Sequence, residues 1–166
     1  MRTFSLVLLG RAVGTALLSR RPAPTPPEPA ASAPALAEVE TLEFWERGSY
    51  IQPISRTCLT RTPEGTLVEL ELYHEEVYQE QAGPELLEQA RAILEEYGVG
   101  GWAGFSGHDP NGLRARSFRL EATLADGTRI EAHGENKFPP NYRDVMSALD
   151  DLTAAAQKNA LQQYTP

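Results

Sequence analysis

Alternating apolar and polar residues predict β-strands over much of the chain. Residues 39–50, 53–61 and 66–78 alternate in this way, and so does the later stretch 117–134 on both sides of a turn. Side chains in a strand point alternately to the two faces of a sheet, so each stretch predicts a strand with one buried face. The stretch 117–134 predicts a paired ribbon of two strands.

Two of the expected turns end in glycine, and the pairing of apolar positions indicates the length of each loop. Opposed residues of an antiparallel hairpin point to the same face of the sheet. Three-residue loops at 63–65 and at 125–127 also suit a type I turn followed by a left-handed glycine. The apolar pairings that these loops predict are Cys58 with Leu70, Ala122 with Ile130, and Leu120 with Ala132.

Two stretches have the spacing of amphipathic helices. Residues 83–98 carry an apolar stripe, Pro84 suits the first helical position, and Gly98 suits a left-handed cap. A second helix is expected after Asn141, which can cap it. The signals of this second helix fade around Gln157.

Together these elements predict an α+β fold with the order βββαββα. Each helix has one apolar stripe to bury, so both helices should pack on one face of an antiparallel sheet of about five strands. Residues 38–157 would form this single domain, and residues 158–166 would form a C-terminal tail. The length of 166 residues suits one domain with a sizeable core.

The first 37 residues differ in composition from the rest. Residues 1–21 contain an apolar stretch, 4–18, together with several arginines. This segment predicts an atypical export signal or a membrane-associating segment, with an ordinary N-terminus as the alternative. Residues 22–37 contain six prolines and predict an extended linker.

The charge of the chain argues against one class of partner. The formal net charge is −8, and residues 38–166 hold 11 basic and 22 acidic side chains. Nucleic-acid binding depends on Lys and Arg that displace counterions from phosphates, so we expect no nucleic-acid partner. Cys58 is the only cysteine, which excludes an intrachain disulfide.

Candidate catalytic chemistry in the sequence is incomplete. The histidines His74, His108 and His133 do not stand at the helical spacing of a metal-ligand pair, and His108 occupies the last glycine position of a G-x-S-x-G pattern. We therefore assign no catalytic residue, metal or cofactor. The enzymatic alternative is a metal-dependent hydrolase, which requires the fold to bring His108, His133 and Glu135 together.

Five glycines in residues 98–107 surround Trp102 and Phe105. Glycines let a loop run close to neighbouring backbone, and aromatic side chains among them need either a core or a partner. One interpretation is that both aromatic side chains fold back and plug the end of the sheet. The other is a recognition loop, in which rigid aromatic side chains supply contact area.

Residues 102–149 carry the patterns W-x-G-F, S-F-x-L and D-G-T-x-I-x-A-x-G-x-N-x-F-P-x-N-Y. In these patterns the chain resembles a set of small bacterial proteins of unknown function, often with export signals. The resemblance implies no activity. Most shared positions serve a hairpin or a helix start, and Asn136 and Lys137 are the polar positions that such roles explain least.

The leading hypothesis is a noncatalytic binding domain, displayed on the proline-rich linker at or outside the bacterial membrane. The loops 100–113 and 134–140 would bind a protein or a small ligand. The residues assigned to this site are Trp102, Phe105, His108, Asp109, Asn136 and Lys137. The alternatives are the hydrolase described above and a purely structural subunit whose charged sheet face pairs with another chain.

Overall fold

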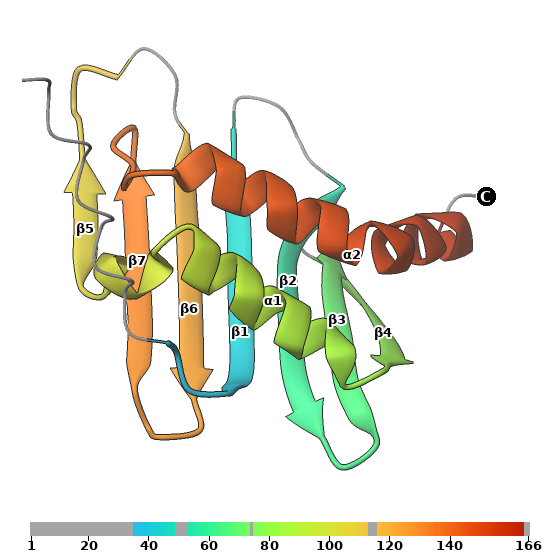
Figure 1. The fold of residues 1–166 in the computed structure, drawn as a ribbon. Helices are drawn as coiled ribbons and strands as arrows, with labels where there is room; N and C mark the ends of the chain where they lie inside the picture. Colours follow the sequence, from blue (N-terminus) through green and yellow to red (C-terminus); the bar gives the residue numbers. More distant parts are fainter. Residues whose placement is uncertain (1–34, 49–52, 74, 113–115, 165–166) are drawn as a thin grey trace, which may run out of the picture. The chain divides into compact units, whose positions relative to one another are not determined.

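The computed structural model describes residues 35–48, 53–73, 75–112 and 116–164 (Figure 1). All of these residues belong to one compact unit of the chain, residues 33–166. The predicted segment 1–21, most of the predicted linker and His74 lie outside the described residues. Within the described ranges, no helix combines the length and the apolar character that a membrane span requires.

Among the described residues, seven strands form one mixed sheet in the order β4-β3-β2-β1-β6-β7-β5. Neighbouring strands are antiparallel except β5 and β7, which run parallel. The strands are β1 Val39–Arg47, β2 Ile54–Thr62, β3 Gly65–Leu72, β4 Glu76–Ala82, β5 Phe105–His108, β6 Ser117–Leu124 and β7 Arg129–Glu135.

Two α-helices, α1 (Glu85–Glu96) and α2 (Tyr142–Tyr164), cover one face of this sheet (Figure 1). A short 3-10 helix, η1 (Val99–Trp102), follows α1. Gly98 between them has a φ of 69°, so it adopts the predicted left-handed cap. The prediction of an α+β fold with both helices on one face is confirmed.

The sheet has two more strands than the five that the sequence indicates. The stretch 66–78, expected to be one strand, is divided at Tyr73 into β3 and β4, and Tyr73 itself has a φ of 52°. The second additional strand, β5, lies in the glycine-rich segment and is only four residues long. It pairs with β7 at the edge of the sheet, where a short strand can form without an apolar pattern of its own.

One of the two hairpin predictions is confirmed. The loop 125–127 sets Leu120 opposite Ala132 and Ala122 opposite Ile130, and Gly127 has a φ of 85°. The prediction of a three-residue loop at 63–65 in the other hairpin is wrong.

The β2–β3 hairpin has a two-residue loop, because Thr62 lies opposite Gly65. Leu59 therefore faces Val68 on the buried side, and Cys58 faces Glu69 on the side away from the helices. Ser55 and Thr57 share the buried face of β2 with Leu59. Because both are polar, the sequence does not show which face of this strand is buried. Desolvation raises the pKa of the half-buried Cys58 thiol, which disfavours the reactive thiolate.

The core lies between the helices and the sheet. Phe118 on β6 is its aromatic centre, with Trp102, Phe105, Phe138 and Tyr142 around it at ring-centroid distances of 4.7 to 6.3 Å. The largest fully buried side chains include Phe44, Phe118, Leu42, Leu59, Leu70, Leu72, Leu87, Leu94, Leu120, Ile130 and Leu149.

Both ends of the folded unit extend beyond the predicted domain. Residues 158–164, expected to belong to a tail, form the last turns of α2, where the small side chain of Ala160 is buried. Alanine favours helix but adds little apolar contrast, which explains why the signal fades in the sequence. At the other end, Leu36 and Ala37 of the predicted linker pack against the core.

Candidate functional site

Trp102, a residue of the predicted recognition loop 100–113, belongs to the core. Its side chain is 3% exposed and meets Phe118 edge-on, with 6.3 Å between ring centroids. Phe105 is half-buried and also packs against Phe118, at 6.2 Å. The structure thus places these residues as the plug of the first interpretation, and Trp102 offers no surface to a partner.

Asn136, directly after β7, holds two neighbouring segments together through hydrogen bonds. It has a left-handed φ of 56°, and its main-chain nitrogen donates to the Arg116 oxygen at 2.8 Å. Its side-chain oxygen accepts a hydrogen bond from the Arg116 nitrogen at 3.1 Å, and its side-chain nitrogen lies 3.5 Å from the Asp109 carbonyl oxygen. Asn136 therefore joins the segments before β6 and after β5, and this role explains its identity.

Asp109 and Lys137 also have local roles. The Asp109 carboxylate accepts a hydrogen bond from the main-chain nitrogen of Asn111 at 3.0 Å, the geometry of an Asx turn. Lys137 has an exposed side chain, and its main-chain oxygen lies so close to Gly107 and Gly134 that a Cβ atom there would stand 2.8 and 2.2 Å from it. The close approach of backbone explains these two glycines.

The residues of the metal-hydrolase alternative form separate pairs. His108 Nδ1 lies 3.2 Å from a Glu135 carboxylate oxygen, and His133 Nε2 lies 3.0 Å from Ser106 Oγ, across β5 and β7. Within the described ranges, no group of three or more His, Cys, Asp or Glu side chains is arranged to hold a metal ion. The described residues thus provide no convergent ligand set for this alternative.

The serine–histidine contact between Ser106 and His133 was not predicted. Nucleophilic catalysis needs a third group that orients the histidine. Among the described residues, no acidic side chain forms an ion pair with His133, and both members of the pair are exposed on the sheet. We therefore interpret the contact as a cross-strand hydrogen bond.

The sheet face opposite the helices carries charges that are matched within the chain. Arg56 on β2 contacts Glu43 at 3.0 Å and Glu71 at 3.2 Å, and Arg119 pairs with Glu121. Exposed ion pairs of this kind add little stability, but they reduce the excess charge that a partner chain would meet. The structural-subunit alternative stays a prediction.

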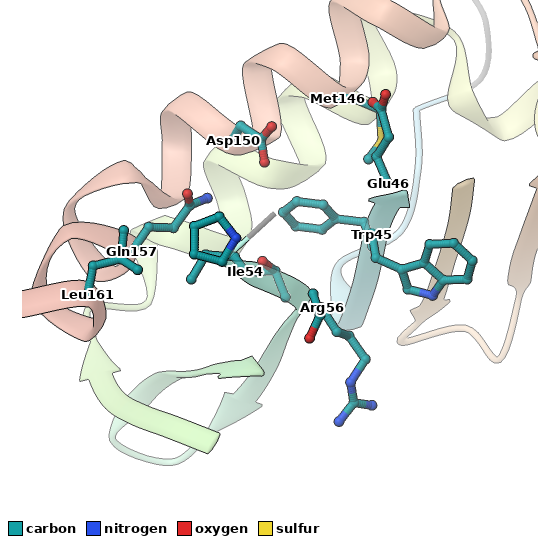
Figure 2. A pocket seen from close by; sticks show the side chains of 12 residues that line it. Trp45, Glu46, Ile54, Arg56, Met146, Asp150, Gln157 and Leu161 are labelled. Carbon is teal, nitrogen blue, oxygen red and sulfur yellow. The ribbon is translucent and has the colours of Figure 1, made fainter. Parts of the chain in front are cut away.

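A hollow lies between α2 and the adjoining ends of β1 and β2 (Figure 2). Its volume is about 240 Å³. We call it the α2 hollow. It is lined by Phe44, Trp45, Glu46, Pro53, Ile54, Ser55, Arg56, Thr57, Met146, Asp150, Gln157 and Leu161.

The periodicity of the elements brings these side chains together. Met146, Asp150, Gln157 and Leu161 are separated by four, seven and four residues, so they follow one side of α2. Figure 2 shows Asp150 and Gln157 on the side of α2 that faces the strands, whereas Trp45 projects to the far side of the sheet.

A β-bulge shapes the strand side of the hollow. The register of β2 against β3 shifts between Ile54 and Arg56, so Ser55 stands at the bulge. The Ser55 hydroxyl donates to the Glu71 carbonyl oxygen at 3.0 Å. Bulges redirect side chains and occur often beside functional sites. Here the bulge lies where β2 enters the hollow.

The α2 hollow is acidic above an apolar floor. Phe44 and Met146 are 2% and 4% exposed, whereas the Asp150 side chain is open to solvent at the edge. Desolvation raises the pKa of Asp150, the nearby Gln157 amide opposes this, and the Glu46 charge adds to it. Glu46 already pairs with Arg116, but Asp150 has no cationic partner among the described residues.

Tyr142 lies next to this acidic group. Its ring is 4% exposed, and desolvation followed by the adjacent Glu46 carboxylate holds its pKa far above the usual tyrosine range. The hydroxyl nevertheless makes no hydrogen bond of normal geometry within the described residues. The carboxylate therefore acts on the hydroxyl through charge and proximity rather than as an aligned acceptor.

Comparison with known proteins provides no family for this chain. No protein-family model matches it, and no curated protein shows significant sequence similarity to it. The function must therefore be inferred from the geometry of the site.

Proposed function

We propose that this protein is a noncatalytic binding module and that the α2 hollow is its ligand site. The ligand is a cationic group on an apolar stem, such as a lysine or arginine side chain of a partner protein, or a small organic amine. Lysine and arginine bury their methylene stems on apolar surface while the charge stays at the polar edge. The floor and the edge of the hollow complement these two parts.

The observation that carries the proposal is the position of Asp150. Its carboxylate stands beside the apolar floor of Phe44 and Met146, has a raised pKa, and lacks a cationic partner among the described residues. A ligand cation would offset the partial desolvation of this carboxylate and the repulsion from Glu46. The charge of the protein supports the same ligand, because a net charge of −8 attracts cations over a distance.

The size of the site limits the ligand to a small group. Pockets that enclose a drug-sized ligand have volumes of about 300–1,000 Å³, whereas the α2 hollow measures about 240 Å³. One side chain or one alkylammonium ion fits this volume. Specificity for a larger partner would then come from the surfaces around the hollow.

Binding of simple probes tests the proposal. n-Butylammonium and the amide of N-acetyl-lysine are titrated into the full chain, and backbone amide shifts around Ile54, Met146 and Asp150 are followed by NMR. Neutral n-butanol has the same stem without the charge. We expect saturable shifts with both ammonium probes and at least tenfold weaker binding of butanol, since a charged hydrogen bond contributes about 1.5 kcal/mol or more.

A matched pair of variants assigns the effect to one carboxylate. Asp150→Asn removes the proposed counter-ion at nearly constant volume, and Asp151→Asn removes the same charge from the next, exposed residue of α2. We expect about tenfold weaker ammonium binding for Asp150→Asn only. Equal losses in both variants, or equal binding of butylammonium and butanol, would contradict the proposal.

The cellular setting is a separate part of the hypothesis. Display at the cell envelope depends on residues 1–34, which lie outside the described residues. N-terminal sequencing of protein from the envelope fraction would test it, since a cleaved export signal predicts a mature chain that lacks the apolar stretch 4–18. This result does not affect the assignment of the α2 hollow.

A further inference from the structure

A second cavity, separate from the α2 hollow, lies beside the glycine-rich segment. Its volume is about 480 Å³, and its walls include Leu94 of α1, Ile130 of β7, Leu36, and the backbone of Gly98, Gly100 and Gly101. We call it the glycine cavity. The Trp102 plug leaves the glycines of this segment without a complete explanation, and the cavity accounts for two of them.

Gly100 and Gly101 are not required by backbone geometry. Gly98 has a left-handed φ of 69° and needs glycine for the end of α1, but Gly100 and Gly101 lie outside the left-handed region. A Cβ atom at Gly101 would meet no other atom within 4 Å, and one at Gly100 would make only an ordinary contact of 3.4 Å with Leu36. A side chain could therefore start at either position without a clash, at the wall of the cavity.

The described residues that line the glycine cavity carry no unmatched charge. Glu95 is the one ionisable residue among them, and its carboxylate accepts hydrogen bonds from the Leu36 nitrogen at 2.8 Å and from Arg91 at 2.9 Å. Arg91 also donates to the Leu36 carbonyl oxygen at 3.2 Å. The charges at the edge are therefore matched among the described residues, which offer an ionised ligand no free counter-charge.

We propose that the glycine cavity binds a small neutral molecule with an apolar body, such as an aromatic ring or a branched alkyl group. Apolar walls favour apolar occupants, and the volume lies within the range of about 300–1,000 Å³ that is usual for ligand sites. The absence of side chains at Gly100 and Gly101 keeps the space open. This ligand differs in class from the cation of the α2 hollow, so the two proposals stand independently.

Toluene, with benzylammonium as a charged probe of similar size, tests the inference on the full chain. Toluene is expected to give saturable NMR shifts of the Gly98, Gly100 and Gly101 amides. Benzylammonium should bind there at least tenfold more weakly and should shift residues of the α2 hollow instead. If toluene leaves the glycine amides unshifted, or if both probes bind there with equal affinity, the inference is overturned.

Filling the cavity provides the second test. Gly101→Leu places a branched side chain in the open space and should weaken toluene binding at least tenfold. The control Gly48→Leu adds the same side chain where a Cβ atom also meets nothing within 4 Å, away from the cavity, and should bind toluene like the wild type. If Gly101→Leu does not fold, the toluene affinity of Gly101→Ala is measured instead, and a smaller loss of affinity is expected. Unchanged affinity in a folded Gly101 variant would refute the inference.

Discussion

The Asn141 side-chain nitrogen donates a hydrogen bond to the main-chain oxygen of Tyr97, at 3.2 Å. Tyr97 is the C-cap of α1, and Asn141 directly precedes α2, so the bond joins the end of one helix to the start of the other. Asn141 has a φ of 59°, and its own carbonyl oxygen accepts the helical bond from Val145 at 3.0 Å. Its side chain thus serves α1, whereas the sequence predicts a cap for α2.

Two substitutions at Asn141 should separate its two roles. Asn141→Gly keeps the left-handed conformation and loses the hydrogen bond, at a cost of about 0.5–1.5 kcal/mol. Asn141→Ala loses the bond and adds the strain of a left-handed residue, roughly 1 kcal/mol more. Urea denaturation measures both free energies of unfolding. Equal stability of the two variants would show that the left-handed conformation carries no cost here.

Trp102 should prove to be a core residue when it is truncated. Trp102→Ala removes a ring that is 3% exposed and contacts Phe118, so we expect a loss of about 3–5 kcal/mol of unfolding free energy. Lys137→Ala at the exposed neighbouring loop should change stability by less than about 0.5 kcal/mol. A Trp102→Ala variant as stable as the wild type would restore the recognition-loop interpretation.

The elements with strict periodicity could be predicted from the sequence. The β6–β7 hairpin has long alternating strands, so a shift by one residue would expose Leu120 and Ile130, and only the loop 125–127 avoids this. The stripe of α1 and its glycine cap are equally unambiguous. In each case the local pattern and the buried face agree.

Elements whose buried face is weakly apolar could not be predicted. The buried face of β2 contains the polar residues Ser55 and Thr57 beside Leu59. The sequence therefore wrongly indicates that the face with Cys58 is the buried one. β4 and β5 occupy the two edges of the sheet, where neighbouring strands supply hydrogen bonds on one side and the sequence needs little apolar pattern. Tertiary context overrides propensity at such positions.

The candidate site was partly visible in the sequence. Asp150 stands four residues after Met146 and seven before Gln157, on the side of α2 that faces the strands. An acidic residue on the inner side of an amphipathic helix indicates a candidate functional site. Nothing in the sequence places that side of α2 against the bulge at Ser55, because the contact joins segments about 95 residues apart. The aromatic residue Trp102, in contrast, points to the loop 100–113 in the sequence, but its side chain belongs to the core.

The raised pKa of Asp150 predicts a pH dependence of stability. The folded state holds the Asp150 proton more tightly than the unfolded state does. The free energy of unfolding therefore falls as the pH rises from the ordinary Asp pKa of about 3.9 through the raised pKa of the folded state. Asp150→Asn lacks the group. The stability of the wild type relative to this variant should therefore fall across that interval, measured by urea denaturation from acidic to neutral pH.

Ligand binding should follow the same titration with the opposite trend. An ammonium ion pairs with the ionised carboxylate, so n-butylammonium affinity should rise with pH through the folded pKa of Asp150 and become constant above it. Asp150→Asn should show no such rise. A pH-independent affinity in the wild type would separate the binding site from Asp150.

Two tyrosines with contrasting hydroxyl groups provide the last prediction. The Tyr142 hydroxyl is buried without a hydrogen bond among the described residues, whereas the Tyr78 hydroxyl donates to Glu80 at 2.6 Å. A buried polar group without a partner costs about 1–3 kcal/mol, so Tyr142→Phe should leave stability unchanged or raise it by about 1 kcal/mol. Tyr78→Phe removes a satisfied bond at the surface and should lower stability slightly. Both substitutions delete one hydroxyl and keep the ring, and the unfolding free energy of each variant is compared with that of the wild type. A clear loss of stability in Tyr142→Phe would mean that Glu46 does accept a hydrogen bond from this hydroxyl in solution.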